Sequence, residues 1–329
     1  MSWKGKKVLV TGAGGFIGSH LTARLLELGA DVRAMVRYNS RNSRGQLDDI
    51  EIPSGGNLET VSGDIRDARF VRAAAQDCEV VFHLAALIGI PYSYAAPSSY
   101  VDTNIVGTLN VLEAVRETGA KRLVHTSTSE VYGSAIYVPI DEAHPLQAQS
   151  PYSASKIAAD KMVDSYHASF EVPAVIVRPF NTYGPRQSLR AILPSVLQQA
   201  LVSDEIRVGS VDPVRDLTYV SDTVNGFLQA ATAKGVEGKT INLGTGTGYS
   251  VSELIEKACK AAGRNPPVVV EEQRVRPAAS EVSRLISSNA LAREILDWQP
   301  KVSIDEGIAL MLPWFRENSD YYDASVYNV

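Results

Sequence analysis

The sequence predicts an α/β protein, with a doubly wound parallel sheet and a smaller C-terminal lobe that is partly interleaved with it. Three observations predict this fold. A glycine-rich turn at residues 11–18 separates a strand-like apolar run from an amphipathic helix. Short apolar runs then alternate with helical patterns as far as residue 177. After residue 180 the elements become shorter, so we expect a first domain of residues 1–180, with 215–245 contributing, and a second lobe of residues 181–329.

The first half begins with a parallel βαβ unit. Lys7 to Val10 reads as a buried strand, Phe16 to Leu28 as a helix capped by Gly29, and Asp31 to Val36 as the second strand. The elements expected after this unit are a strand at 58–62, a helix at 67–76, a strand at 80–83, a helix at 100–118, a strand at 122–126, a helix at 151–170 and a strand at 174–177. Such alternation places helices on both faces of one sheet.

The second half has a different residue pattern. Arginines, turn residues and a proline-rich break at residues 265–267 separate short elements. Helices are expected at 192–201, 221–233 and 250–262. Residues 240–242 form a buried-looking strand, as residues 174–177 do, so pieces of the two lobes should interleave.

Composition narrows the class of partner. The chain has 329 residues, 45% of them hydrophobic and 21% charged, with a net charge of −5 and a pI near 5.6. This balance argues against nucleic acid or an acidic membrane as a partner. The two cysteines are far apart, which indicates free thiols in a reducing compartment, and the five histidines show no shared metal-ligand spacing. With no signal peptide and no membrane-length apolar run, we expect a cytoplasmic protein without a metal site.

The glycine turn predicts a bound dinucleotide. Gly12, Gly15 and Gly18 have GxxGxxG spacing between a strand and a helix, and Phe16 and Ile17 begin that helix. The first glycines permit a tight turn and close approach to a pyrophosphate, and the last allows the helix to pack closely on the strand. A glycine motif alone is a poor signal, but the surrounding βαβ context makes it specific for a Rossmann dinucleotide site.

The end of the second strand favours NADP. An acidic residue there would bind the ribose hydroxyls of NAD, whereas this chain has Val36 followed by Arg37, with Ser40 nearby. A guanidinium can bind a 2′-phosphate, although a solvated basic loop remains the alternative and NAD remains possible. After the third strand, Asp64 and Ile65 are placed to meet the adenine.

A tyrosine and a lysine supply the first candidate catalytic pair. Tyr152 and Lys156 lie four residues apart on a predicted helix, so they share one face. A nearby ammonium would lower the pKa of the Tyr152 phenol and make it a base for a hydroxyl proton. Taken alone, such a pair is more often an ordinary helix face.

A run of hydroxyls ends in a carboxylate at the carboxyl edge of the sheet. Ser127, Thr128, Ser129 and Glu130 follow the strand at 122–126, where open α/β sheets place ligands. The run offers hydrogen-bond donors and a base at one point. By itself it could equally be a strand end whose serines cap a turn.

Taken in order, the motifs resemble those of the extended short-chain dehydrogenase/reductases that act on nucleotide-activated sugars. The motifs are TGxxGxxG, His83-Leu84-Ala85-Ala86, Asn104, Thr128-Ser129-Glu130, YxxxK, the run from Arg178 to Arg186, and Arg215-Asp216-Leu217-Thr218-Tyr219-Val220. The match covers roughly residues 5 to 315 and is specific as an ordered set.

The resemblance implies further site residues and a partner. It implies cofactor contacts from Leu84, Ala85, Ala86, Asn104, Ser127 and Pro179, in addition to Tyr152 and Lys156. It implies contacts to a nucleotide-sugar substrate from Ser93 and Asn181. The phosphates of such a substrate need cations, and the candidates are the second-lobe arginines Arg186, Arg215 and Arg276, of which the resemblance matches the last two. For any single loop arginine, a solvated surface position is the alternative. It also implies a homodimer formed by the helices at 100–118 and 151–170.

Within this superfamily the chain most resembles the nucleotide-hexose 4,6-dehydratases. Residues 87–94 and 38–43 resemble the branch acting on nucleotide-linked N-acetylglucosamine in legionaminic-type acid pathways, and the Thr-Ser-Glu run resembles GDP-mannose 4,6-dehydratase. Sugar 4-epimerases usually lack a glutamate at the position of Glu130. Glucose dehydratases usually have an aspartate in place of Ser129, so the group that protonates the departing hydroxyl stays open.

The expected reaction forms a 4-keto-6-deoxy sugar. Tyr152 takes the C4 hydroxyl proton, Thr128 binds the same oxygen, and Glu130 removes the C5 proton that the ketone acidifies. Three alternatives stay open: a 4-epimerase, a UDP-glucuronate decarboxylase, and a non-catalytic NADP-binding sensor. A sensor would need neither the Tyr152–Lys156 pair nor Glu130.

Overall fold

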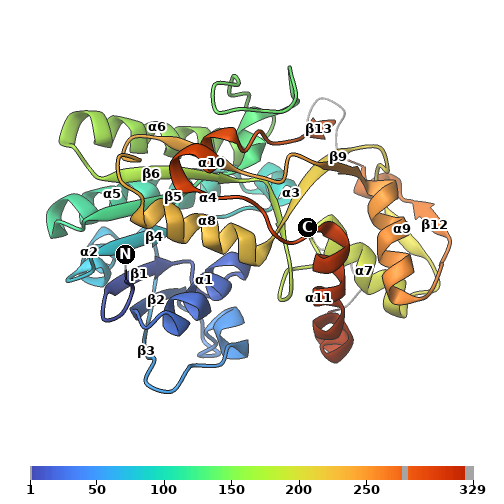
Figure 1. Ribbon diagram of the computed structural model, residues 1–329, viewed down its shortest axis with the longest axis horizontal. Coiled ribbons are helices and arrows are strands. Elements are labelled where there is room, and N and C mark those ends of the chain that lie inside the picture. Colours follow the sequence, from blue (N-terminus) through green and yellow to red (C-terminus); the bar gives the residue numbers. More distant parts are fainter. Residues whose placement is uncertain (1, 276–280, 323–329) are drawn as a thin grey trace.

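A seven-stranded parallel sheet forms the centre of the molecule in the computed structural model, which describes residues 2–275 and 281–322 (Figure 1). The strand order is β10-β6-β5-β4-β1-β2-β3. The strands are β1 (Lys7–Thr11), β2 (Asp31–Arg37), β3 (Asn57–Gly63), β4 (Val80–His83), β5 (Arg122–Thr126), β6 (Ala174–Pro179) and β10 (Thr240–Leu243). The chain proceeds outward from β1 in one direction and then from β4 in the other, so the strand order reverses between these two strands, where doubly wound sheets bind ligands at the carboxyl ends. The doubly wound fold is thereby confirmed.

Helices cover both faces of this sheet (Figure 1). One face carries α2 (Ala68–Ala75), α5 (Gly107–Thr118) and α6 (Pro151–Phe170), and the other carries α1 (Phe16–Glu27) and α8 (Val220–Thr232). Alternate side chains of a strand point to opposite faces. In β1, Val8 and Val10 enter the core beneath α1 and α8, whereas Leu9 enters the core beneath α2, α5 and α6.

A smaller sheet begins where β6 ends. It contains β7 (Asn181–Tyr183), β9 (Val214–Tyr219), β11 (Gly248–Ser250) and β13 (Arg284–Leu285). Around it lie α7 (Ile192–Val202), α9 (Val251–Ala262), α10 (Ala290–Leu296), α11 (Ile304–Glu317) and the strand pair β8 (Ile206–Val208) and β12 (Val268–Val270). Since β10 and α8 belong to the large sheet and its cover, the second half does return to the first. The domain boundary at residue 180 stays a prediction.

The expected helix at 100–118 is three segments. A short helix, α4 (Pro97–Tyr100), leads into a π-helix at Val101–Val106, and α5 continues from Gly107. A π-helix forms bonds from residue i to i+5 and is frequent at functional sites, and this one contains Asn104. Hydrophobic periodicity could not reveal it, because an added residue in one turn hardly changes the apolar pattern.

Several elements, most of them short, were not expected from the sequence. They are α3 (Ile90–Ala95) and the 3-10 turns at Gly45–Asp49, Ser129–Tyr132, Glu272–Arg274 and Ser319–Tyr321, besides β7, β8, β9, β11, β12, β13, α10 and α11. Strands of two or three residues are too short to show alternation.

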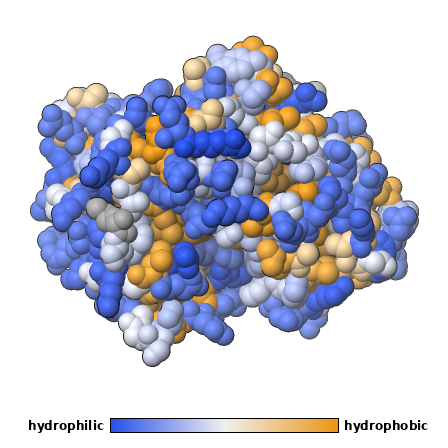
Figure 2. All heavy atoms as spheres, in the orientation of Figure 1, coloured by the Kyte–Doolittle hydropathy of each residue, from blue (hydrophilic) through white to orange (hydrophobic). Residues whose placement is uncertain are grey.

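Polar residues cover most of the face drawn in Figure 2, with apolar side chains in small patches between them. In residues 2–275 and 281–322, none of the helices has the length and apolar character needed to span a membrane. Cys78 and Cys259 are both buried and free of a disulfide.

Candidate active site

The glycine turn after β1 has the geometry of a dinucleotide cradle. Gly12 has φ of +69°, and a Cβ added there would lie 2.8 Å from the backbone nitrogen of Ala85. At Gly18, a Cβ would meet the carbonyl oxygen of Gly12. Gly15 caps α1 with no side-chain hydrogen bond, which leaves the helix N-terminus open to an anion such as a pyrophosphate. The residues present therefore fit a dinucleotide. The tight turn expected at Gly12 and the close backbone packing expected at Gly18 are observed, whereas the approach to a pyrophosphate stays a prediction.

The loop after β4 is fixed by buried polar groups. The Thr11 hydroxyl accepts hydrogen bonds from the backbone nitrogens of Leu84 and Ala85, both at 3.2 Å. Its oxygen also lies 2.9 Å from Nδ1 of His83, whose Nε2 contacts the Thr108 hydroxyl at 3.1 Å. Burial lowers the pKa of His83, so the imidazole is neutral and serves as a structural bridge. Leu84, Ala85 and the following Ala86 are half-buried beside the glycine turn.

Asn104 connects this loop to the helix of Tyr152. Its amide accepts from the nitrogen of Leu87 at 2.8 Å, donates to the carbonyl of Leu87 at 3.0 Å, and donates to the Ser155 hydroxyl at 2.9 Å. Asn104 is buried, and the π-helix turns it toward both partners. It therefore fixes the loop relative to α6.

The adenosine end of the predicted cofactor site is open. Arg37 ends β2 with an exposed side chain, and Ser40 is exposed in the loop that follows. Asp64 is held by Arg66 through contacts of 2.9 and 2.6 Å, and this hydrogen bonding lowers the pKa of the carboxyl. Ile65 is buried, and its carbonyl accepts from Asn110. The end of β2 carries Arg37 and no carboxylate of the kind that would bind the ribose hydroxyls of NAD, as the sequence indicated.

Tyr152 and Lys156 lie on one buried face of α6. The helix starts at Pro151 and is capped by a reciprocal pair of hydrogen bonds between Ser150 and Ser153. Tyr152 is 6% exposed and Lys156 is 4% exposed. The Lys156 ammonium donates to the carbonyl oxygen of Thr126 at 2.6 Å, at the carboxyl end of β5.

The expected lowering of the pKa of Tyr152 is wrong for the protein without ligands. Burial raises the pKa of this phenol, a hydrogen bond with Thr128 acts against that, and the charge of Glu130 raises it further. Burial also lowers the pKa of Lys156 to about 8. The sequence argument counted the attraction between the two groups and left out the cost of removing both from water.

The hydroxyl run forms a 3-10 turn beside this tyrosine. Thr128 caps the turn, and its hydroxyl accepts from the backbone nitrogen of Glu130 at 3.2 Å. Ser129 is buried, whereas Glu130 is partly exposed. Since the charge of Glu130 affects the pKa of Tyr152, the two groups lie within electrostatic reach of each other. The structure therefore places the Thr128 hydroxyl in contact with both the Glu130 backbone nitrogen and the Tyr152 phenol.

A second tyrosine extends the site toward α3. The Tyr100 ring lies 6.2 Å from the Tyr152 ring in an edge-on arrangement, and its hydroxyl bonds the carbonyl of Gly89. Burial raises the pKa of Tyr100, and the charge of Arg190 acts against it. Ser93, expected to bind substrate, is buried and donates to the carbonyl of Ile90 at 2.6 Å, so it can meet a ligand as an acceptor while that bond is kept.

The expected phosphate ligands are placed unequally. Asn181 begins β7 and is partly buried, directly after the half-buried Pro179 at the end of β6. Arg215 lies in β9 and pairs with Glu281 at 3.2 Å. Arg276 lies outside the described residues.

Arg186 is a buried cation in a left-handed backbone conformation. It is 7% exposed, has φ of +68°, and its Nε lies 3.3 Å from Nε2 of His20 on α1. Burial lowers the pKa of Arg186, and Asp49 acts against this only through its charge. Within the described part of the chain, no carboxylate forms an ion pair with it. A buried guanidinium in this position is suited to an anionic ligand.

Sequence reasoning missed the buried carboxylate of Asp160. Its Oδ2 accepts from the Ser127 hydroxyl at 2.7 Å and from Nη2 of Arg178 at 2.9 Å, and it is fully buried. Ser127, expected to meet the cofactor, therefore also contacts α6. The spacing of Tyr152, Lys156 and Asp160, each four residues apart on one helix face, was a signal available in the sequence.

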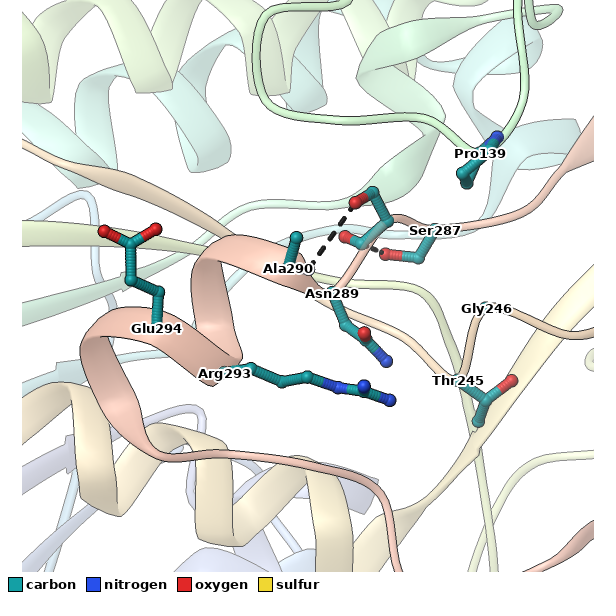
Figure 3. A pocket seen from close by; sticks show the side chains of 9 residues that line it. Pro139, Thr245, Gly246, Ser287, Asn289, Ala290, Arg293 and Glu294 are labelled. Carbon is teal, nitrogen blue, oxygen red and sulfur yellow. Dashed lines mark hydrogen bonds between the residues drawn. The ribbon is translucent and has the colours of Figure 1, made fainter.

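A pocket of about 640 Å³ lies elsewhere, at the start of α10 (Figure 3). Its lining is Pro139, Thr245, Gly246, Ser287, Ser288, Asn289, Ala290, Arg293 and Glu294. None of these residues was expected to bind cofactor or substrate. In residues 2–275 and 281–322, no three His, Cys, Asp or Glu side chains gather as metal ligands would.

Comparison with known proteins identifies the family. The GDP-mannose 4,6-dehydratase family model matches residues 9–311. A UDP-glucose 4-epimerase of Mycolicibacterium smegmatis is 34% identical over 320 residues, covering 95% of this chain and 99% of that protein. The dTDP-D-glucose 4,6-dehydratase of Mus musculus is 30% identical over 319 residues, covering 95% of this chain and 89% of that protein.

A solved structure agrees. The dTDP-glucose 4,6-dehydratase of Streptomyces venezuelae, solved with NAD bound, has a TM-score of 0.85 and 28% identity, covering 96% of this chain and 99% of that one. The match extends over both halves of the molecule. The chain belongs to the GDP-mannose 4,6-dehydratase family of extended short-chain dehydrogenase/reductases, whose relatives include nucleotide-sugar 4,6-dehydratases and 4-epimerases.

Proposed function

We propose that the protein is a nucleotide-sugar 4,6-dehydratase, and that its substrate is an NDP-hexose, specifically an NDP-linked N-acetylglucosamine. The observation that carries this proposal is the placement of Glu130 in the turn that Thr128 caps. The Thr128 hydroxyl accepts from the backbone nitrogen of Glu130 at 3.2 Å and also hydrogen-bonds the Tyr152 phenol, whose pKa the charge of Glu130 raises. An epimerase has no task for a carboxylate here. A dehydratase needs one, because the C5 proton must be removed after C4 becomes a ketone.

The residues divide the work as follows. Tyr152 takes the proton of the C4 hydroxyl, and Thr128 donates a hydrogen bond to the same oxygen as charge develops on it. Lys156 supplies the nearby positive charge that favours the phenolate. A bound nicotinamide dinucleotide supplies the hydride acceptor and donor. Gly12, Gly15 and Gly18 would hold its pyrophosphate.

Elimination then depends on the carboxylate. Glu130 removes the C5 proton, and the C6 hydroxyl departs as water with a proton from Glu130 or Ser129. Elimination leaves a C5–C6 double bond, which then takes up a proton at C5 and, at C6, the hydride that was lost from C4. The product is a 4-keto-6-deoxy sugar, with no net oxidation. Partial exposure of Glu130 allows it to face a sugar, whereas burial of Ser129 favours Glu130 as the proton donor.

For the cofactor we propose NADP, with NAD as the alternative. The support is the exposed Arg37 at the end of β2, where no carboxylate stands to repel a 2′-phosphate. The solved relative cited above was obtained with NAD, so the choice must be measured.

We also propose a cytoplasmic homodimer joined through the π-helix, α5 and α6. Val101, Val106 and Phe170 are 48%, 39% and 51% exposed on these neighbouring helices. Apolar side chains exposed on packed helices suit a helical contact with a second copy. Light scattering of the purified protein would show twice the chain mass.

Product mass distinguishes the candidate reactions. The protein is incubated with UDP-, GDP- and dTDP-linked glucose, N-acetylglucosamine, mannose and glucuronate. Loss of water supports the dehydratase, and loss of carbon dioxide indicates a decarboxylase. A new stereoisomer of unchanged mass indicates a 4-epimerase, which the 34% identical mycobacterial relative makes the second candidate. Cofactor binding without turnover indicates a sensor.

The role of Glu130 is tested in deuterated water. We expect Glu130→Gln to lose dehydration by at least about 100-fold while still reducing the cofactor with substrate, because only the C5 step needs the carboxylate. Glu256→Gln, an exposed change on α9, should leave the rate unchanged. If C5 acquires deuterium in Glu130→Gln at the unmutated rate, another group is the base.

A further inference from the structure

Asp160 is a fully buried carboxylate on α6, and its charge raises the pKa of Lys156 against the effect of burial. Lys156 and Asp160 lie one helical turn apart on α6, which places their side chains on the same face. Lys156 is 4% exposed and Asp160 is fully buried, so their mutual attraction is screened far less than that of a surface pair. We propose that Asp160 is a positioning residue that keeps Lys156 in its ammonium form and ties the carboxyl end of β5 to α6.

The geometry shows how the carboxylate reaches both elements. Its Oδ2 accepts from Ser127, the residue immediately before Thr128, at 2.7 Å. The same oxygen accepts from Nε and Nη2 of Arg178 on β6 at 3.2 and 2.9 Å. Oδ1 lies 3.3 Å from Nε2 of His125 on β5. One carboxylate thus joins β5, α6 and β6 directly below the hydroxyl run.

In the described part of the chain, the other ionisable groups around Lys156 provide no negative charge, so stabilisation of its ammonium depends on Asp160. Burial lowers the pKa of Lys156, and the charge of Asp160 is what raises it again. His125 also faces this space, but burial and the nearby Lys156 lower its pKa, so it is neutral. Arg178 is a cation and cannot stabilise an ammonium. Burial likewise keeps His83 and Tyr152 uncharged at neutral pH.

A purely structural ion pair would not need this arrangement. Arg178 already donates to the Tyr132 hydroxyl at 2.9 Å, and Tyr132 donates to Asn242 at 2.7 Å, so the guanidinium is anchored on its far side. Although burial opposes it, neighbouring His125 and Arg178 lower the pKa of Asp160 to about 2. Asp160 is therefore a permanent negative charge throughout the range in which Lys156 titrates.

The inference rests on the proposed function only in requiring that Tyr152 and Lys156 act on a sugar hydroxyl, which holds for a dehydratase and for an epimerase. A test without substrate separates the two ideas. Unfolded lysine titrates near 10.5, whereas buried Lys156 titrates near 8, so the unfolded chain binds more protons between these values. The free energy of unfolding should therefore rise with pH from about 8 to about 10.5.

The experiment is a series of urea titrations between pH 6 and 11 on the full chain, with turnover measured over the same range. In Asp160→Asn we expect both the onset of that rise and the alkaline limb of turnover to move about one pH unit lower. Asp160→Glu, which keeps the charge, should restore the original onset. Asp222→Asn removes another buried carboxylate, which caps Lys301 and Val302, and should lower stability without moving the onset.

Arg178→Gln provides the opposite test. It removes the cation that competes with Lys156 for the Asp160 carboxylate. The pH at which the free energy of unfolding begins to rise should therefore move higher. The inference is overturned if Asp160→Asn is less stable but keeps the original onset and pH profile, since that outcome describes a structural pair alone. It is also overturned if Asp160→Asn fails to fold and Arg178→Gln leaves the onset unchanged or fails to fold as well. Loss of all turnover with the expected shift in onset would contradict only the proposed reaction.

Discussion

The buried face of α6 and the arginines of the second half, both proposed to serve the nucleotide-sugar site, are built differently. Tyr152, Lys156 and Asp160 lie on a long helix packed against the central sheet, and their polar atoms meet partners within the first half. Arg186 and Arg190 lie on the loop between β7 and α7. The first group is fixed before any ligand arrives, whereas the second carries positive charge whose natural partner is an anion.

This difference predicts which substitutions should alter the rate of chemistry and which should alter binding. Groups on a rigid helix act on reacting atoms, so a change of one atom alters the rate of chemistry. Loop cations act on parts of the substrate that do not react, so their loss should weaken binding more than chemistry. The predictions below test that division, from the largest expected effect to the smallest.

Tyr152→Phe should lower turnover by about 10²- to 10⁴-fold, because it removes the proton acceptor for the C4 hydroxyl. Cofactor affinity and folding should change little, as the ring and its contact with Tyr100 are kept. Steady-state kinetics and a cofactor titration check both parts. A tenfold rise in KM with normal turnover would instead assign Tyr152 to binding.

Acid should weaken the junction between the halves at His20. This imidazole contacts the carbonyl of Pro185, and burial lowers its pKa to about 4, compared with 6.5 when unfolded. Because the unfolded chain takes up the proton first, stability should fall as pH drops from 6.5 to about 4, by up to about 3 kcal/mol. Urea titrations of the protein and of His20→Gln, whose curve should be flatter over this window, measure the effect. An identical slope in both would assign the loss to His83 and His125.

Arg186→Met should raise KM for the nucleotide sugar or the cofactor Kd by about 10- to 100-fold, since a hydrogen bond to a charged group contributes about 1.5–3 kcal/mol. Turnover at saturation should change less than threefold. Arg293→Met, an exposed arginine in the pocket of Figure 3, is the control and should change neither. A loss of turnover without a change in binding would place Arg186 with the chemical groups.

The smallest effect is expected at the adenosine end. Arg37→Ala should weaken NADP binding about tenfold and leave NAD binding nearly unchanged, because only NADP carries the 2′-phosphate. Fluorescence titration with both cofactors measures the ratio. Equal weakening for both would indicate that Arg37 acts on a part the two cofactors share.

Sequence patterns predicted the features that depend on neighbours along the chain. The turn at Gly12 and Gly18 follows from steric limits, and the large-sheet strands follow from apolar runs long enough to recognise. Features set by distant neighbours were not accessible. The pKa of Tyr152 depends on how deeply α6 is buried, and the cluster around Asp160 requires residues from three elements. The position of Arg186 depends on a single left-handed residue and on His20.

The π-helix at Val101–Val106 determines the rotation, about the helix axis, of the residues that precede α5. One surplus residue is stored in that turn, so α5 keeps its packing while Asn104 is rotated to face Leu87 and Ser155. Each residue of an α-helix advances about 100° around its axis. A chain shortened by one position there would still make a continuous helix, with Asn104 on another side. In related chains, an insertion or deletion in that segment would therefore abolish the site while leaving the fold intact.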